Sequence, residues 1–153
     1  MFLYIMLISF FVHEKALFLS RFKIKQISNL SDGKYTCLII EDDPAFVEIL
    51  KIVVKKVTEV KLLGSCDNTL EAAKRIDMDK PDILLLDINI SGLEGPEVLE
   101  ISDHKPKTIV ISSHPEEVMD NYEVDYVSFI QKPLKNSDQL VNAIHKCIKL
   151  MGH

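Results

Sequence analysis

The chain of 153 residues lacks the sequence patterns of several common enzyme and redox classes. It contains neither G-x-x-x-x-G-K nor G-x-G-x-x-G, so nucleotide hydrolysis loses its main support. No G-x-S-x-G elbow is present, which disfavours an esterase. The three cysteines form no C-x-x-C pair and lie in or beside apolar runs. We therefore expect buried thiols in a reducing compartment, and neither a disulfide nor a zinc site.

A strong charge of either sign is also missing. The formal net charge is −5, with 47% hydrophobic and 27% charged residues, which excludes intrinsic disorder and fits one globular domain. Residues 1–33 carry a net charge of +2 and the remaining body carries −7. Because an acidic surface repels a phosphate backbone, nucleic-acid binding is disfavoured for this body. A cation site or a basic partner surface suits it better.

The N-terminal run MFLYIMLISFFV (1–12) is almost wholly apolar, but a membrane-spanning helix needs roughly 20 such residues. A secretory signal is disfavoured because neither a basic leading region nor a small-residue cleavage site is present. Three interpretations stay open: a mis-assigned translation start, an interfacial or short anchoring segment, and an extra packing helix. We divide the chain into an apolar extension and linker (1–33) and a body (34–152). Membrane contact is expected only through residues 1–22, and the basic residues after the apolar run predict a cytoplasmic body.

From Tyr35 onward, short apolar runs alternate with helical patterns. Continuous apolar runs predict buried strands, and the expected strands are 36–40, 60–64, 83–86, 108–111 and 126–130. The expected helices are 44–57, 68–76, 96–102, one opened by Pro115 and a last one capped by Asn136 or Ser137. This alternation predicts an α/β fold, a doubly wound five-stranded parallel sheet with helices on both faces. In such sheets the functional crevice lies at the carboxyl ends of the strands.

Polar and charged side chains follow four of the five expected strands. Glu41 and Asp42 follow the first strand, Asp87 the third, Ser112 the fourth and Lys132 the fifth. Clustered carboxylates are costly unless a cation neutralises them, and a set of oxygen ligands favours Mg²⁺ or Mn²⁺ over zinc. Each residue alone has an ordinary structural explanation, and the neighbouring Asp43 is most simply a helix cap. Their joint position at strand ends is what predicts a functional site.

Four stretches together resemble the receiver domain of response regulators. They are LIIEDDPAF (38–46), DILLLDINISGLEGPEVL (82–99), IVISSH (109–114) and VSFIQKPL (127–134). The resemblance covers about residues 34–152 and implies the flavodoxin-like strand order 2-1-3-4-5. Residues 114–133 are further similar to receivers that are often fused to a LytTR DNA-binding domain.

The resemblance implies a role for each residue at the strand ends. Asp87 would accept a phosphoryl group from a phosphohistidine. Mg²⁺ would be held directly by Asp42 and Asp87, through a water by Glu41, and by the backbone carbonyl of Asn89. Lys132 would pair with the phosphoryl oxygens, and its bond to Pro133 would be cis.

A second group of residues would act as the switch. Ser112 would move toward the phosphoryl group, and Phe129 would rotate inward at the aromatic switch position. Asn89 and His114 flank the crevice and would tune how fast water reaches the acyl phosphate. The chain departs from the family pattern at Ile90-Ser91, where Met-Pro is usual, and at Phe129, which lacks the hydroxyl group of a tyrosine.

The resemblance also implies partners. The phosphoryl donor would be a sensor histidine kinase or a phosphotransfer protein, and a downstream effector protein would recognise the switched face. Homodimerisation on activation is one option, and no direct nucleic-acid contact or catalysis beyond the domain's own phosphorylation and dephosphorylation is expected. Three alternatives stay open: a receiver fragment of a LytTR-type transcriptional regulator, a metal-dependent phosphatase or phosphotransferase, and a degenerate receiver. The intact acidic set and Lys132 disfavour the last.

Overall fold

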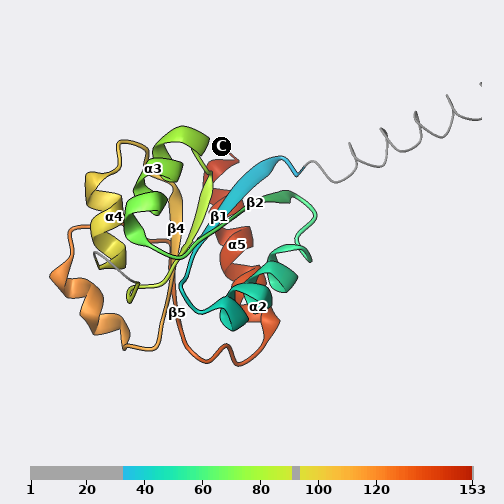
Figure 1. The fold of residues 1–153 in the computed structure, drawn as a ribbon. Coiled ribbons are helices and arrows are strands. Elements are labelled where there is room, and N and C mark those ends of the chain that lie inside the picture. Colours follow the sequence, from blue (N-terminus) through green and yellow to red (C-terminus); the bar gives the residue numbers. More distant parts are fainter. Residues whose placement is uncertain (1–32, 91–93, 153) are drawn as a thin grey trace, which may run out of the picture. The chain divides into compact units, whose positions relative to one another are not determined.

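Five parallel strands form one sheet in the order β2-β1-β3-β4-β5, which confirms the predicted order (Figure 1). The computed structural model describes residues 33–90 and 94–152. The expectations for residues 1–32 lie outside this range. The strands are β1 (Tyr35–Ile40), β2 (Val60–Cys66), β3 (Ile83–Leu86), β4 (Lys107–Ser112) and β5 (Ser128–Gln131).

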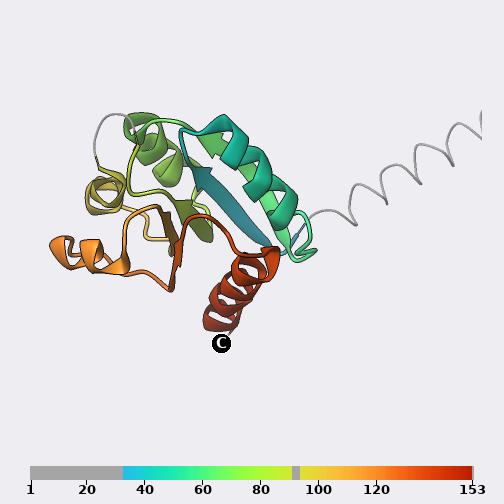
Figure 2. The ribbon, with the colours of Figure 1, turned by 90° about the horizontal axis from the view of Figure 1, so that it is seen from below.

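Helices cover both faces of the sheet, as the sequence predicts. Figure 1 shows α3 and α4 on one side of the strands and α2 and α5 on the other. The α-helices are α2 (Pro44–Val54), α3 (Thr69–Asp79), α4 (Gly95–Ile101) and α5 (Ser137–Met151). A 3₁₀-helix, η1 (Glu116–Asn121), precedes β5 and lies apart from α5 in the view of Figure 2.

Strand β3 shows why helices cover both faces of the sheet. All four of its side chains are buried. Ile83 and Leu85 pack in the cluster beneath α2 and α5, whereas Leu84 and Leu86 pack in the cluster beneath α3 and α4. Successive side chains of a strand point to opposite faces, so a continuous apolar run requires both layers of helices.

The helix starts follow the predicted capping chemistry. The Asp43 side chain accepts hydrogen bonds from the backbone N–H groups of Ala45 (2.9 Å) and Phe46 (3.4 Å), which confirms its role as a cap. Asn68 and Asn136 cap α3 and α5 in the same way. These side chains satisfy backbone donors that have no partner within the helix.

The prediction for residues 115–130 is wrong in two details. The segment opened by Pro115 is a 3₁₀-helix of 6 residues, not an α-helix, and Met119 is its one buried residue. A segment that buries one side chain has no apolar stripe to hold a longer α-helix against the sheet. Strand β5 begins at Ser128 and not at Tyr126, because the pairing with β4 starts with Ser128 opposite Ile109.

All three cysteines are free and buried, as predicted: Cys37, Cys66 and Cys147. Burial raises the pKa of the Cys147 thiol to about 11, and the pKa of the Cys37 thiol is also raised by burial. These thiols are therefore protonated and packed as small apolar groups. Among the residues that the structure describes, no helix combines the length and the apolar character needed to cross a bilayer.

Candidate functional site

The carboxyl ends of the strands bring the predicted site residues to one edge of the sheet. Helix α2, which follows β1, and helix α4, which follows β3, lie on opposite faces, so a crevice opens between the two strand ends. Glu41, Asp42 and Asp87 each place a carboxylate oxygen within 4.8 Å of the others. The backbone N–H of Glu41 donates to Cys66 O (3.0 Å), and that of Asp87 donates to Ile40 O (2.9 Å). Hydrogen bonds to neighbouring strands therefore fix the backbone positions of Glu41 and Asp87.

Lys132 joins this cluster from β5. Its Nζ donates to Glu41 Oε2 (2.7 Å) and to Asp87 Oδ2 (2.8 Å). Its backbone N–H donates to Ser112 O (2.7 Å), and the Lys132-Pro133 peptide bond is cis, as expected. The structure thus brings together residues from three separate places in the sequence, Glu41-Asp42, Asp87 and Lys132, as their positions at the strand ends predicted.

Burial controls the electrostatics of the crevice. Glu41 is only 2% exposed, and burial raises the pKa of its carboxyl group, although hydrogen bonds from Lys132 and from the Asp43 N–H work in the other direction. Burial alone would lower the pKa of Lys132, but its hydrogen bonds to Asp87 and Glu41 outweigh burial and raise it. The lysine therefore stays charged and offsets part of the negative charge of the carboxylates.

The Asp87 carboxylate is held at both of its oxygens. Oδ2 accepts from Lys132, and Oδ1 accepts from the backbone N–H of Asn89 (3.1 Å). Behind it, Gly95 packs so closely on the Asp87 backbone that a side chain at this position would collide with the Asp87 carbonyl oxygen. The Gly95 N–H also donates to Ile88 O (2.7 Å). Asp87 is 6% exposed and points into the crevice from a fixed backbone.

The hydroxyl group of Ser112 is fully buried and engaged with the loop that follows β4. Its Oγ accepts from the backbone N–H of His114 (3.0 Å). The side-chain amide Nδ2 of Asn89 donates to His114 Nδ1 (2.9 Å), so the imidazole and the amide meet at the mouth of the crevice. This bond places Asn89 and His114 side by side.

Phe129 lies in a different environment from the acidic residues. It packs in a small cluster around Ile88, Val110 and Met119, and its ring meets Tyr126 edge to face at a centroid distance of 6.4 Å. The hydroxyl of Tyr126 donates to Glu116 Oε1 (2.8 Å), which ties this cluster to η1. Phe129 thus lies in the cluster that connects β5 with η1.

The donor set of the crevice fits a hard divalent cation. Glu41, Asp42 and Asp87 offer oxygen ligands alone, the ligand type that Mg²⁺ and Mn²⁺ prefer, and the Asn89 backbone carbonyl follows two residues after Asp87. A hollow of about 400 Å³ lies beside the cluster and is lined by Glu41 and Asp42. Glu41 and Asp87, which form ion pairs with Lys132, are two of these three carboxylates.

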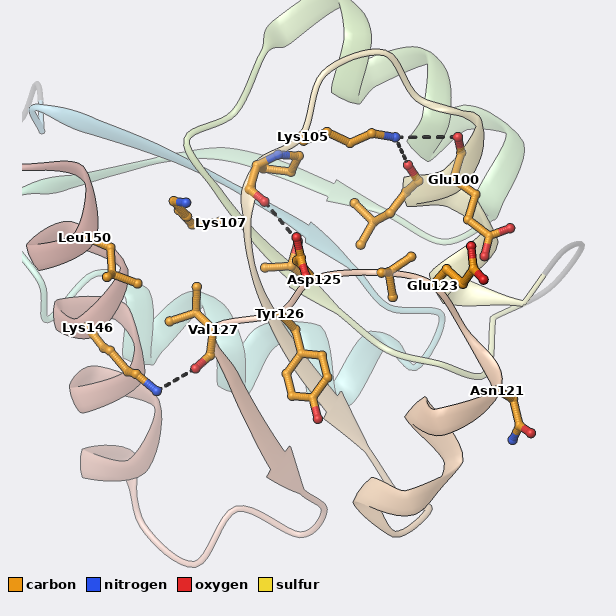
Figure 3. Close-up of a pocket in the computed structure, with 14 residues that line it drawn as sticks. Glu100, Lys105, Lys107, Asn121, Glu123, Asp125, Tyr126, Val127, Lys146 and Leu150 are labelled. Atoms are coloured by element: carbon orange, nitrogen blue, oxygen red, sulfur yellow. Dashed lines mark hydrogen bonds between the residues drawn. The ribbon is translucent and has the colours of Figure 1, made fainter.

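A pocket larger than this hollow lies elsewhere, near the amino ends of β4 and β5 (Figure 3). Its volume is about 1100 Å³. Two of its lysines are already engaged: Lys105 Nζ donates to carbonyl groups at the end of α4, including Ser102 O (2.6 Å), and Lys146 Nζ donates to Val127 O (2.7 Å). The predicted site residues are absent from its lining, so size does not identify the functional site here.

Two contributors to the site have no direct signal in the sequence. Phe46 places its ring against the Lys132 ammonium group, with 4.3 Å from Nζ to the ring centroid. Its helical spacing with Ile49 and Leu50 indicates only a core position. Gly95 lies one residue before the helix expected at 96–102, but in the structure it begins α4 and lets that helix approach Asp87. Both depend on contacts between segments that are distant in the sequence.

Comparisons with known proteins agree with this geometry. Residues 37–145 match the family described as the response regulator receiver domain. The positive alginate biosynthesis regulatory protein of Pseudomonas aeruginosa is 34% identical over 113 residues, which are 71% of this chain and 45% of that protein. The transcriptional regulatory protein BtsR of Salmonella typhi is 26% identical over 111 residues, 71% of this chain and 46% of that protein. The chain thus spans about half the length of these curated relatives.

Solved structures show the same fold. The signal receiver domain of a modulated diguanylate cyclase from Desulfovibrio desulfuricans has a TM-score of 0.66 and 28% identity, covering 75% of this chain and 94% of that chain. The response regulatory domain of protein MrkE from Klebsiella pneumoniae has a TM-score of 0.67 and 24% identity, covering 75% and 96%. Sheet order, acidic crevice and family match lead to one conclusion: the chain belongs to the response regulator receiver domains of two-component systems.

Proposed function

We propose that the chain is the phosphoryl-accepting module of a two-component phosphorelay and that Asp87 is the acceptor. The observation that carries this proposal is the placement of the Asp87 carboxylate, which lies in an acidic cluster and 2.8 Å from the ammonium nitrogen of Lys132. The donor would be the phosphohistidine of a sensor histidine kinase or a phosphotransfer protein. Receiver domains act with kinases and downstream effectors, and the family match supports both partner classes.

In the proposed reaction, a carboxylate oxygen of Asp87 attacks the phosphorus atom of the phosphohistidine. A P–O bond forms and the P–N bond breaks, and the donor imidazole leaves with the electron pair. Lys132 provides positive charge beside the oxygens of the transferred group, which is where charge stabilisation acts in phosphoryl transfer. The backbone N–H of Asn89 holds the other carboxylate oxygen and so orients the nucleophile.

Receiver domains bind Mg²⁺ at an acidic pocket, and Glu41, Asp42 and Asp87 form such a cluster in this chain. We propose that these carboxylates and the Asn89 carbonyl would hold Mg²⁺ or Mn²⁺. When bound, the cation would supply positive charge that offsets the charge of the phosphoryl oxygens. Lys132 would then release one of its two carboxylate partners and bond the phosphoryl group.

The same site would act as a switch. Ser112 Oγ accepts from the His114 N–H, and because a hydroxyl can accept and donate at the same time, its O–H would donate to a phosphoryl oxygen on Asp87 once the side chain moves toward it. Phe129 lies opposite Val110, which is two residues before Ser112 on β4, and packs in one cluster with Met119 of η1. Its inward rotation would change the face formed by η1, β5 and α5, which a downstream effector or a second copy would recognise.

Labelling with acetyl phosphate and Mg²⁺ tests the proposal. The wild type is expected to gain one phosphoryl group, detected as a shifted band on a Phos-tag gel and as a modification that base and hydroxylamine remove, as expected for an acyl phosphate. Asp87→Asn should gain none, whereas the matched control Asp103→Asn, at an exposed loop position, should label normally. Labelling of Asp87→Asn at another residue at the wild-type rate would contradict the assignment. Repeated turnover of a small phosphate ester would instead favour a phosphatase or phosphotransferase.

A second candidate is the receiver part of a longer transcriptional regulator. Relatives that are named transcriptional regulatory proteins are about twice as long as the matched region. Sequencing the transcript beyond the codon of His153 tests this candidate. A reading frame that continues into a DNA-binding domain would support it, and a stop codon directly after His153 in the transcript would refute it.

A further inference from the structure

The ring of Phe46 contacts the Lys132 ammonium group, although Phe46 is not one of the acidic residues proposed to bind the cation or the phosphoryl group. The residue lies in the first turn of α2, and its ring centroid is 4.3 Å from Lys132 Nζ. The cap of α2 fixes this turn, because Asp43 accepts hydrogen bonds from the N–H groups of Ala45 and Phe46. The ring also packs against the core cluster beneath α2 and α5. Its position is thus set independently of Lys132.

The ring completes the surroundings of the ammonium group. A lysine ammonium has three N–H donors, and two of them are occupied by Glu41 Oε2 and Asp87 Oδ2. The face of an aromatic ring attracts a cation at distances below about 6 Å. The Lys132 side chain is 18% exposed, so the ring takes a place that water would otherwise fill.

The contact between Lys132 and the Phe46 ring differs from the hydrogen bonds of Lys132 to Glu41 and Asp87, because it does not have to break during phosphoryl transfer. Lys132 must exchange a carboxylate oxygen for a phosphoryl oxygen, so its bonds to Glu41 and Asp87 are remade. The contact with the ring face involves no atom that takes part in this exchange. It can therefore hold the ammonium group at the crevice throughout the reaction.

We infer that Phe46 is a positioning residue, which keeps the Lys132 ammonium group directed at the acceptor carboxylate through its aromatic face. This inference rests on the proposed function and deepens it, because it names a residue that the acidic motif does not contain. If the inference holds, efficient phosphorylation requires an aromatic side chain at position 46, and an apolar side chain of similar size is not enough.

Substitutions that keep the apolar bulk but remove the ring provide the test. In Phe46→Leu and Phe46→Met, the initial rate of labelling by acetyl phosphate with Mg²⁺ should fall about fivefold, within the range that a partly desolvated cation–π contact supports. Phe46→Tyr, which keeps the ring, should label within about twofold of the wild type. Ile52→Ala is the control on the same helix, because this side chain is 61% exposed, and it should leave the rate unchanged.

A double-mutant cycle separates positioning from general packing. In a Lys132→Met background, Phe46→Leu should no longer change the labelling rate, because the cation has been removed. A structural role of Phe46 would lower the rate equally in both backgrounds, and this result would overturn the inference. A wild-type rate in both Phe46→Leu and Phe46→Met would overturn it as well.

Nuclear magnetic resonance provides a measurement that does not depend on phosphorylation. Protons at the end of the Lys132 side chain lie over the ring face, so their signals should be shifted upfield by the ring current. The shift should persist in Phe46→Tyr and disappear in Phe46→Leu, and its absence from the wild type would refute the contact. If the wild type shows the shift but no labelling at Asp87, the proposed function fails while the contact stands.

Discussion

Removal of the Lys132 charge tests how the crevice tolerates its buried carboxylates. Lys132→Met keeps a long, unbranched apolar stem but leaves Glu41 and Asp87 without their shared cation. These side chains are 1% and 7% exposed, respectively, so water cannot replace the lost partner. We expect the variant to fold and to be substantially less stable than the wild type at pH 7 in the absence of divalent cations.

The structure sets the size of the effect. Breaking a buried ion pair by removing one partner typically costs about 3–5 kcal/mol. Because the Lys132 side chain is 18% exposed and part of its solvation survives, we expect the low end, about 3 kcal/mol. For a domain of this size, the loss corresponds to a fall in Tm of roughly 10 °C. Mg²⁺ at ten times its Kd should restore about 1.4 kcal/mol by binding the folded state.

Urea unfolding and thermal melts with and without Mg²⁺ measure both quantities. Lys135→Met is the matched control, because Lys135 lies on the exposed loop after β5 and should change stability by less than about 0.5 kcal/mol. A Tm for Lys132→Met within about 2 °C of the wild type, without divalent cations, would refute the reasoning. It would mean that the buried carboxylates do not depend on the ammonium group.

Three further predictions concern the acidic cluster and its support. Asp42→Ala should weaken Mg²⁺ affinity more than about tenfold, measured by isothermal titration calorimetry, because a dication site loses one of three carboxylates; a smaller change would argue for another ligand set. Burial raises the pKa of Glu41, so the stability linked to its protonation is present below its unfolded pKa of about 4.3 and is lost as pH rises through the higher folded pKa. Glu41→Gln should therefore gain stability relative to the wild type as the pH rises above about 4.3 in urea unfolding, and a difference that stays constant with pH would contradict this. Gly95→Ala should destabilise the fold by more than about 2 kcal/mol and slow labelling, because the new Cβ would collide with the Asp87 backbone; unchanged urea unfolding would show that α4 can move aside.

Much of the fold was predictable because its signals are local. The apolar run ILLL before Asp87 indicates a strand that is buried on both faces. Asp43-Pro44 and Asn68 predict two helix starts, and the structure confirms both. The alternation of strands and helices then leads to a parallel sheet, and a parallel sheet brings the ends of its strands together. The gathering of Glu41, Asp42, Asp87 and Lys132 follows from topology alone.

The features that sequence did not predict depend on distances between segments. Nothing local distinguishes Phe46 as the partner of Lys132 from Phe46 as a core residue. The 3₁₀ form of η1 reflects how little of that segment is buried, which is a property of the packed molecule. The role of Gly95 requires knowledge of how close α4 comes to the Asp87 backbone.

The backbone bond from Lys132 N–H to Ser112 O ties the ends of β4 and β5 together at the crevice. Its counterparts from Glu41 to Cys66 and from Asp87 to Ile40 tie the end of β1 to the ends of β2 and β3. A domain built in this way has little freedom to slide its strands past one another when its chemical state changes. If Asp87 is phosphorylated as proposed, the signal would leave through rotating side chains and the short segments outside the sheet, and a partner would distinguish two surfaces while the core keeps a single arrangement.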